Sequence, residues 1–192
     1  MTIFTNPADA APEAAAGYIR AVLDMLGDRD PMAVLAATAD ELRGLSVDVS
    51  PAALRRPEAP GRWSVGEVLA HLADSELVWA FRLRMVLGQE RPALAGYDQD
   101  AWAGRFAYSE LEPRASIDRF SFVRDWNLAL LGAMPDEDFD RTGMHAERGD
   151  ESVRHMTQLY AGHDLVHLAQ IRRILASGAA LDHDRPNPGN EA

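Results

Sequence analysis

The sequence has 192 residues, 47% hydrophobic and 26% charged, and these proportions are typical of one globular domain with a sizeable core. Its formal net charge is −11 and its long cations are all arginines, which argues against nucleic-acid binding and excludes lysine Schiff-base chemistry. The absence of cysteine excludes disulfides, thiolate metal sites and cysteine nucleophiles.

The N-terminal segment, residues 1–30, is expected to be an extension carrying one short helix, Pro12–Leu26. Its first twenty residues lack the basic stretch and apolar core of a secretory signal. No apolar run in the chain reaches the ~18 residues that a membrane span requires. We therefore expect a cytoplasmic protein that does not contact a membrane.

The next two helices are predicted from proline and capping signals. Pro31 suits the first turn of a helix that runs to about Leu45. Three prolines within residues 48–62 then predict an extended connection. Ser64 is followed three residues later by Glu67, a capping box that predicts the start of a helix ending at about Gly88.

The second half of the chain contains a long connection and two more helices. Residues 91–113 are long for a plain loop and are expected to form a lid or pocket wall. Helices are predicted from about Arg114 to Met134 and from Ser152 to Ser177, followed by a flexible tail at 179–192. With almost no strand signal, the predicted fold is an all-α four-helix bundle over residues 31–178.

Two histidines in the last predicted helix raise the question of a metal site. His163 and His167 are four residues apart, which places their rings on one face at about 5–6 Å. They are either ordinary core residues or two ligands of one metal ion, because neutral imidazole is the commonest metal ligand. His71, near the middle of the capped helix, could reach the bundle interior and supply a third ligand.

The other three histidines fit a shared metal site less well. His155 lies about 12 Å from His163 along the helix axis, too far to share one ion. His145 lies in a predicted loop and could approach only from the rim of a pocket. His183 belongs to the predicted tail.

Two segments, WSVGEVLAHLADSE and YAGHDLVHLAQI, resemble the DinB/YfiT-like superfamily of metal-dependent proteins, which includes bacillithiol transferases. The segments ERPALAGYDQDAWA and DEDFDRTGMHAERGD are also similar to that superfamily and occur in the same order. The resemblance implies a four-helix bundle, often a homodimer, with a divalent zinc or nickel ion as cofactor. The implied ligands are His71, His163 and His167. Gln170 departs from the pattern, since close relatives often carry a further histidine there.

The resemblance favours transfer of a low-molecular-weight thiol to a small-molecule electrophile through a metal-bound thiolate. One alternative is hydrolysis of a small molecule by metal-bound hydroxide, since a bound cation lowers the pKa of water toward ~7. Another is a non-catalytic protein that binds metal or a small molecule, and the last is a metal-free bundle. Consumption of thiol with an electrophile distinguishes the first possibility from the others.

Asp74 and Tyr97 are the candidate catalytic residues besides the metal ligands. Asp74 follows His71 by three residues and could orient it or act as a base. The alternative for Asp74 is a solvated residue or one that forms a hydrogen bond between helices. Tyr97 lies in the long connection, where its hydroxyl could face the metal.

Other polar and aromatic residues near these positions have simpler expected roles. Glu67 is explained by the capping box, and Asp164 points away from His163 toward a structural role. Trp102 is expected to seal the end of the bundle. Arg82 and Arg84 could meet an anionic substrate, but a solvated or salt-bridged face is the expectation.

Overall fold

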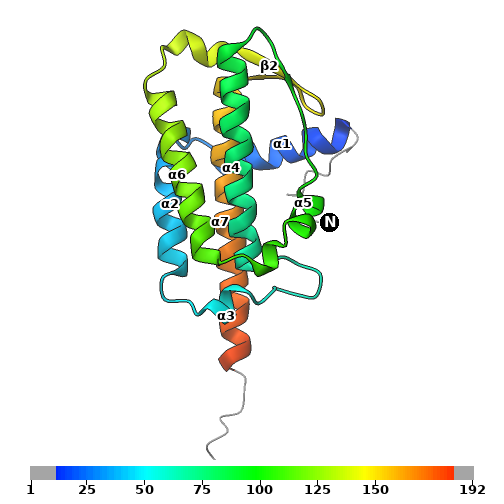
Figure 1. Cartoon of the computed structure of the whole chain (residues 1–192), viewed down its shortest axis with the longest axis vertical. Helices are drawn as coiled ribbons and strands as arrows, with labels where there is room; N and C mark the ends of the chain where they lie inside the picture. Colours follow the sequence, from blue (N-terminus) through cyan, green and yellow to red (C-terminus); the bar gives the residue numbers. More distant parts are fainter. Residues whose placement is uncertain (1–11, 184–192) are drawn as a thin grey trace, which may run out of the picture.

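The computed structural model describes residues 12–183, and Figure 1 shows a bundle of long helices with smaller elements along one side. The elements in chain order are α1 (Pro12–Leu26), α2 (Pro31–Ser46), α3 (Pro51–Leu54), α4 (Val65–Gly88), β1 (Ala93–Leu94), α5 (Gln99–Arg105), η1 (Tyr108–Glu110), α6 (Pro113–Gly132), η2 (Asp136–Asp140), β2 (Thr142–His145), β3 (Gly149–Ser152) and α7 (Val153–His183).

Helices α2, α4, α6 and α7 pack against one another and form the predicted four-helix bundle. The capping box at the start of α4 is confirmed, because the Ser64 backbone N–H donates to Glu67 and the Glu67 backbone N–H donates to Ser64 Oγ. Helix α7 continues to His183, beyond the predicted end at Ser177, and residues 184–192 of the predicted tail lie outside the described part. No helix within residues 12–183 is both long and apolar enough to span a bilayer.

Two connections contain structure that the sequence did not predict. The segment expected to be wholly extended contains α3, which begins because Ser50 caps it and Pro51 occupies its first position. The long connection contains α5, whose N-terminus is capped by Asp98. Both segments therefore contain local capping signals for a helix. The prolines and glycines around these signals led to the prediction of connections instead.

A small three-stranded sheet, in the order β1-β2-β3, was also missed. Strand β1 pairs in parallel with β2, and β2 pairs with β3 as an antiparallel hairpin. These strands have two to four residues, too short to show an alternating pattern in the sequence. The sheet fixes the long connection beside α4, so this segment forms a fixed wall.

The bundle core is divided by a layer of polar side chains. One apolar cluster includes Leu72 of α4 and Leu168 of α7, and the other includes Trp79 and Ala161 of the same two helices. Between them lie buried polar residues of three helices, namely His71, Ser75, Glu76, Arg124, Asn127, Asp164 and His167. Buried polar groups require hydrogen bonds or ions as partners, so this layer is where function is expected.

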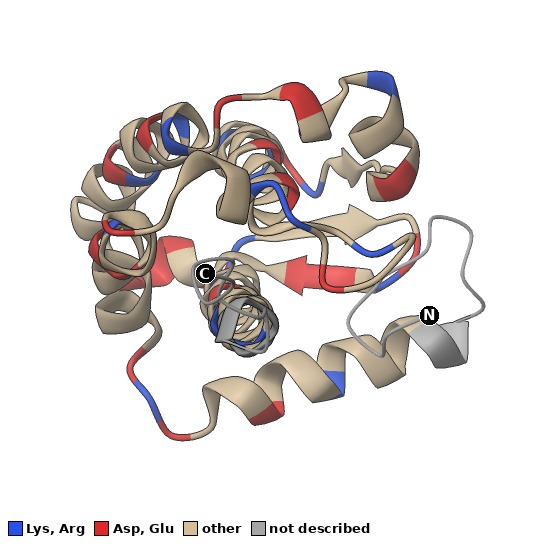
Figure 2. Ribbon diagram, turned by 90° about the horizontal axis from the view of Figure 1, so that it is seen from below, with Lys and Arg blue, Asp and Glu red and all other residues tan. Residues whose placement is uncertain are grey.

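Helix α1 crosses the outside of α7, as Figure 2 shows in a view along the bundle. The crossing is close at Gly162, where a Cβ atom would collide with the carbonyl oxygen of Val22. This contact holds Tyr18 of α1 at the edge of the pocket described below. Figure 2 also shows acidic and basic residues scattered over many of the described elements.

We expect Gly162→Ala to destabilise the protein by about 1–3 kcal/mol, because the added methyl group must push α1 away from α7. Urea unfolding followed by circular dichroism measures the effect. Gly44→Ala is the matched control, since Gly44 is an exposed helical glycine with open space around it. The control should keep or slightly raise the stability. Equal stability of Gly162→Ala and the wild type would show that the crossing is loose.

Candidate metal centre

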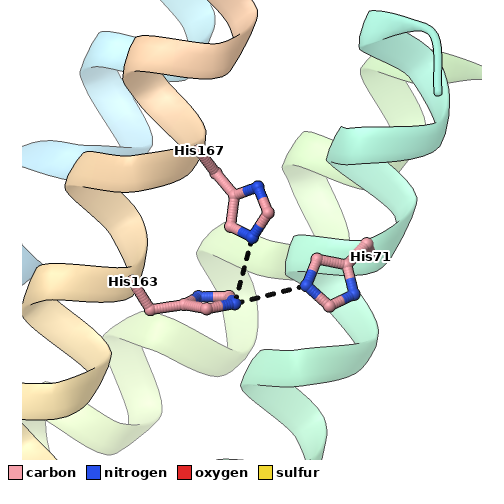
Figure 3. Close-up of side chains that lie close together, drawn as sticks. All are labelled: His71, His163 and His167. Carbon is pink, nitrogen blue, oxygen red and sulfur yellow. Dashed lines mark hydrogen bonds between the residues drawn. The ribbon is translucent and has the colours of Figure 1, made fainter. Parts of the chain in front are cut away.

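The three histidines predicted as ligands converge in the polar layer of the bundle. His71 comes from α4, and His163 and His167 come from successive turns of α7 (Figure 3). The Nε2 atom of His163 lies 3.2 Å from Nε2 of His71 and 3.1 Å from Nε2 of His167. Among residues 15–178, this is the one group of three or more histidine or acidic side chains that brings its ligand atoms within 4.8 Å of one another.

This donor set fits a divalent transition metal. Zinc–nitrogen bonds of about 2.0–2.1 Å in tetrahedral geometry separate the two nitrogens by about 3.3 Å, close to the spacings found here. Three neutral nitrogen ligands suit zinc or nickel better than magnesium or calcium, which prefer oxygen. Three nitrogen lone pairs brought so close together would repel one another without a shared cation or proton.

Gln170 fixes the tautomer of one of these histidines. The Nδ1 atom of His167 lies 2.8 Å from Oε1 of Gln170, one turn further along α7. An amide oxygen only accepts, so His167 must donate from Nδ1 and keep the lone pair of Nε2 for a metal. The residue that departs from the superfamily pattern therefore supports a ligand, a role that the sequence did not predict.

Burial keeps all three imidazoles neutral. Desolvation lowers the pKa of His71 and of His163 well below the usual histidine value, and neighbouring histidines lower each further. Desolvation also lowers the pKa of His167, although Gln170 and Asp164 oppose the shift. The neutral form is the one that binds cations, so these rings are ready to act as ligands at neutral pH.

A pocket opens beside the histidines and gives access to two of them. Its walls come from α1, α4, α7 and the segments around the small sheet, and its lining residues are Tyr18, His71, Ser75, Arg82, Gly96, Tyr97, Gln99, His145, Glu147, Arg148, Leu159, Tyr160 and His163. His167 is absent from this lining and is 5% exposed. A small molecule in the pocket would thus meet a bound metal from the side of His71 and His163.

The two predicted catalytic residues are placed differently. Tyr97 lines the pocket, and burial raises the pKa of its hydroxyl while a hydrogen bond with Ser75 opposes this shift. Asp74 does not line the pocket and accepts a short hydrogen bond from the Tyr108 hydroxyl. Both catalytic roles stay predictions, and only Tyr97 has the position that its role requires.

Two expectations about charged residues are corrected. Arg82 is not on a solvated or salt-bridged face: it is 5% exposed and donates to the Ala95 carbonyl oxygen. His145 is not at a pocket rim, because it ends β2, is 1% exposed and lines the pocket wall. Both errors come from the unpredicted sheet, which brings this part of the chain against α4.

The expected structural role of Asp164 is explained by an arginine that the sequence did not single out. Arg124 of α6 is 1% exposed and forms ion pairs with Asp164 (2.6 Å) and Glu76 (2.7 Å). The polar layer therefore joins α4, α6 and α7 through charges as well as through histidines. An isolated arginine in an otherwise ordinary helix gave no signal of this network.

The remaining aromatic and histidine predictions concern the edges of the site. Trp102 packs against Tyr97 and Phe106, with ring centroids 4.5 and 5.5 Å away, so it supports the pocket wall. His155 does not join the cluster of three histidines. The side chain of His183 lies outside the described residues.

Comparison with known proteins agrees with this geometry. A protein of Oceanobacillus iheyensis, OB0782, whose name describes an inferred metal-dependent hydrolase, is 30% identical over 133 residues, or 69% of this chain and 77% of its own. YfiT of Bacillus subtilis, named in the same way, is 29% identical over 122 residues, or 63% of this chain and 68% of its own.

The solved structure of YfiT, described as a four-helix bundle of unusual topology, matches the fold. It covers 88% of this chain and 90% of its own at a TM-score of 0.69 and 24% identity. The profile of the DinB superfamily matches residues 35–171, which include all three clustered histidines. This chain therefore belongs to the DinB superfamily.

Proposed function

We propose that this protein is a metal-dependent enzyme that transfers a low-molecular-weight thiol to a small electrophile. The observation that carries the proposal is the convergence of three neutral histidines, two of which line a pocket. A divalent cation held there lowers the pKa of a thiol that reaches it and so supplies a nucleophile. His71, His163 and His167 would hold the cation, and Gln170 would keep His167 in the correct tautomer.

The pocket wall suits an electrophile whose oxygen gains negative charge. Burial raises the pKa of Tyr18 to about 12 and also raises that of Tyr160, and both hydroxyls therefore stay protonated. A protonated phenol donates a hydrogen bond and stabilises such an oxygen. The carboxylate proposed as a base, Asp74, already accepts a hydrogen bond from Tyr108. The thiol proton would pass to water instead, because the cation would stabilise the thiolate that remains.

Hydrolysis of a small molecule is the second candidate, favoured by the names of the relatives in Oceanobacillus iheyensis and Bacillus subtilis. It uses the same histidines but requires proton delivery to a leaving group. Glu147, which lines the pocket, would be the candidate carboxylic acid for that step.

A direct assay separates these functions. The zinc- or nickel-loaded protein is mixed with monochlorobimane and bacillithiol, mycothiol or glutathione, and formation of the fluorescent thioether is compared with the uncatalysed rate. We expect acceleration with at least one thiol, lost in His163→Ala. Hydrolysis of esters or amides without consumption of thiol would show that the protein is a hydrolase and not a thiol transferase. A tightly bound metal with neither reaction would favour a binding protein.

A further inference from the structure

The pocket beside the histidines is also lined by the cations Arg82 and Arg148 and by His145. Both guanidinium groups act on the same neighbours. Each helps to lower the pKa of His145, and each opposes the rise that burial causes in the pKa values of Tyr18 and Tyr160. Two cations therefore act on one end of the pocket.

Arg82 is a buried cation with no carboxylate at ion-pair distance among the described residues, and Glu151, which pairs with Arg148, acts on it only from further away. Its Nη2 group donates to the Ala95 carbonyl oxygen, and its buried Nε group meets no acceptor. Two other arginines with little exposure do have carboxylates at ion-pair distance, since Arg124 pairs with two of them and Arg148 pairs with Glu151. A buried cation left unpaired is costly, and an anionic ligand would supply the missing partner.

His145 supplies a second unsatisfied donor. Its Nδ1 atom accepts a hydrogen bond of 3.2 Å from the backbone N–H of Glu147. The neutral ring therefore carries its proton on Nε2, which is buried and has no partner among the described residues. The unsatisfied polar atoms of Arg82 and His145 are thus both donors, and an oxygen acceptor is what would complement them.

We propose that Arg82 and His145 form a carboxylate-binding subsite, so that the substrate carries a carboxylate as well as the group that reaches the metal. A carboxylate would offer one oxygen acceptor to each of these two donors. Glu147 also lines the pocket and would repel a doubly charged phosphate more strongly than a singly charged carboxylate. The inference rests on the proposed function only in taking this pocket as the substrate pocket.

The test compares two thiols of equal chain length, 3-mercaptopropionate, which ends in a carboxylate, and 3-mercapto-1-propanol, which ends in a neutral hydroxyl group. Calorimetry on the cobalt-loaded protein measures their affinities, and the sulfur-to-cobalt absorption band reports whether the thiol reaches the metal. We expect the acid to bind at least about tenfold more tightly than the alcohol. Arg82→Met should reduce this ratio to less than about twofold.

The matched control is Arg84→Met, which should keep the ratio. Arg84 lies on the same helix but donates to Asn127 and stacks over Trp126, outside the pocket. Because Arg82 also holds Ala95, His145→Phe provides a second variant that leaves this contact in place. His145→Phe should lower the ratio several-fold even if Arg82→Met misfolds.

The possible results distinguish a failure of the carboxylate-binding subsite from a failure of the proposed thiol transfer. Equal affinity of acid and alcohol, with the absorption band present, would overturn the subsite and leave the proposed function standing. Arg82-dependent binding of propionate, with no band from either thiol, would support the subsite and remove thiol transfer. Stronger competition by inorganic phosphate than by propionate would overturn the assignment to a carboxylate.

Discussion

Alanine in place of His71, His163 or His167 is expected to reduce the metal content from about one ion per chain to less than about a tenth. Each variant removes one of three converging nitrogens, and two imidazoles from one protein rarely hold zinc or nickel against dialysis. Elemental analysis after reconstitution and dialysis measures the effect.

His155→Ala is the matched control for this experiment. His155 lies on the same helix, is partly exposed and does not belong to the cluster, so its replacement should leave the metal content unchanged. Equal loss in His155→Ala, or full metal content in the three cluster variants, would refute the site.

Replacement of Gln170 should have a graded effect on the same site. Gln170→Ala removes the acceptor for His167 Nδ1 and should weaken metal binding by about 10–100-fold. Gln170→Glu keeps an acceptor at this position and should retain most of the affinity. A competition titration with a metal indicator measures both, and identical affinities would show that the His167 tautomer is fixed by other means.

Arg124→Met is expected to lower the free energy of unfolding by about 3–5 kcal/mol, more than Gly162→Ala. The variant leaves Glu76 and Asp164 as buried carboxylates without their cation. Burial already raises the pKa of Glu76, against the opposing effects of Arg124 and Asn127. Removal of the arginine therefore leaves a charge that the surroundings cannot stabilise.

Equilibrium unfolding in urea measures this loss, with Arg119→Met as the control. Arg119 lies on the same helix but is exposed, so its replacement should change the stability by less than about 0.5 kcal/mol. A loss below about 1 kcal/mol for Arg124→Met would mean that water or a shifted side chain replaces the ion pairs.

The network of Arg124 also bears on the metal centre. Asp164 lies next to His163 in α7, and its pairing with Arg124 of α6 holds this turn of the helix against the bundle. The layer thus combines a rigid charged frame with the three ligands, as sites held within about 0.5 Å require. Metal content and stability should therefore fall together in Arg124→Met.

Local signals in the sequence were sufficient for the main helices. The capping box at Ser64, the proline at the start of α2 and the spacing of apolar residues act within one or two turns. The i, i+4 spacing of His163 and His167 likewise fixes their common face, because it depends only on the pitch of one helix.

Other features depend on contacts between segments far apart in the chain. His71 meets His163 across 92 positions in the chain. The family resemblance implied this contact, but only the packing of α4 against α7 shows it. The roles of Arg82, Arg124, His145 and Gln170 were not predicted.

The amino-acid sequence by itself determined the long helices and the capping box of α4, and it indicated the three histidines that converge, because these follow from short-range geometry and from a pattern of residues in order. Only the tertiary structure decided which polar atoms are buried, which are paired and which face the pocket. The physical reason is that desolvation and ion pairing depend on all neighbours at once. Two arginines of α6 show this difference: Arg119 is exposed to solvent, whereas Arg124 is buried and pairs with two carboxylates.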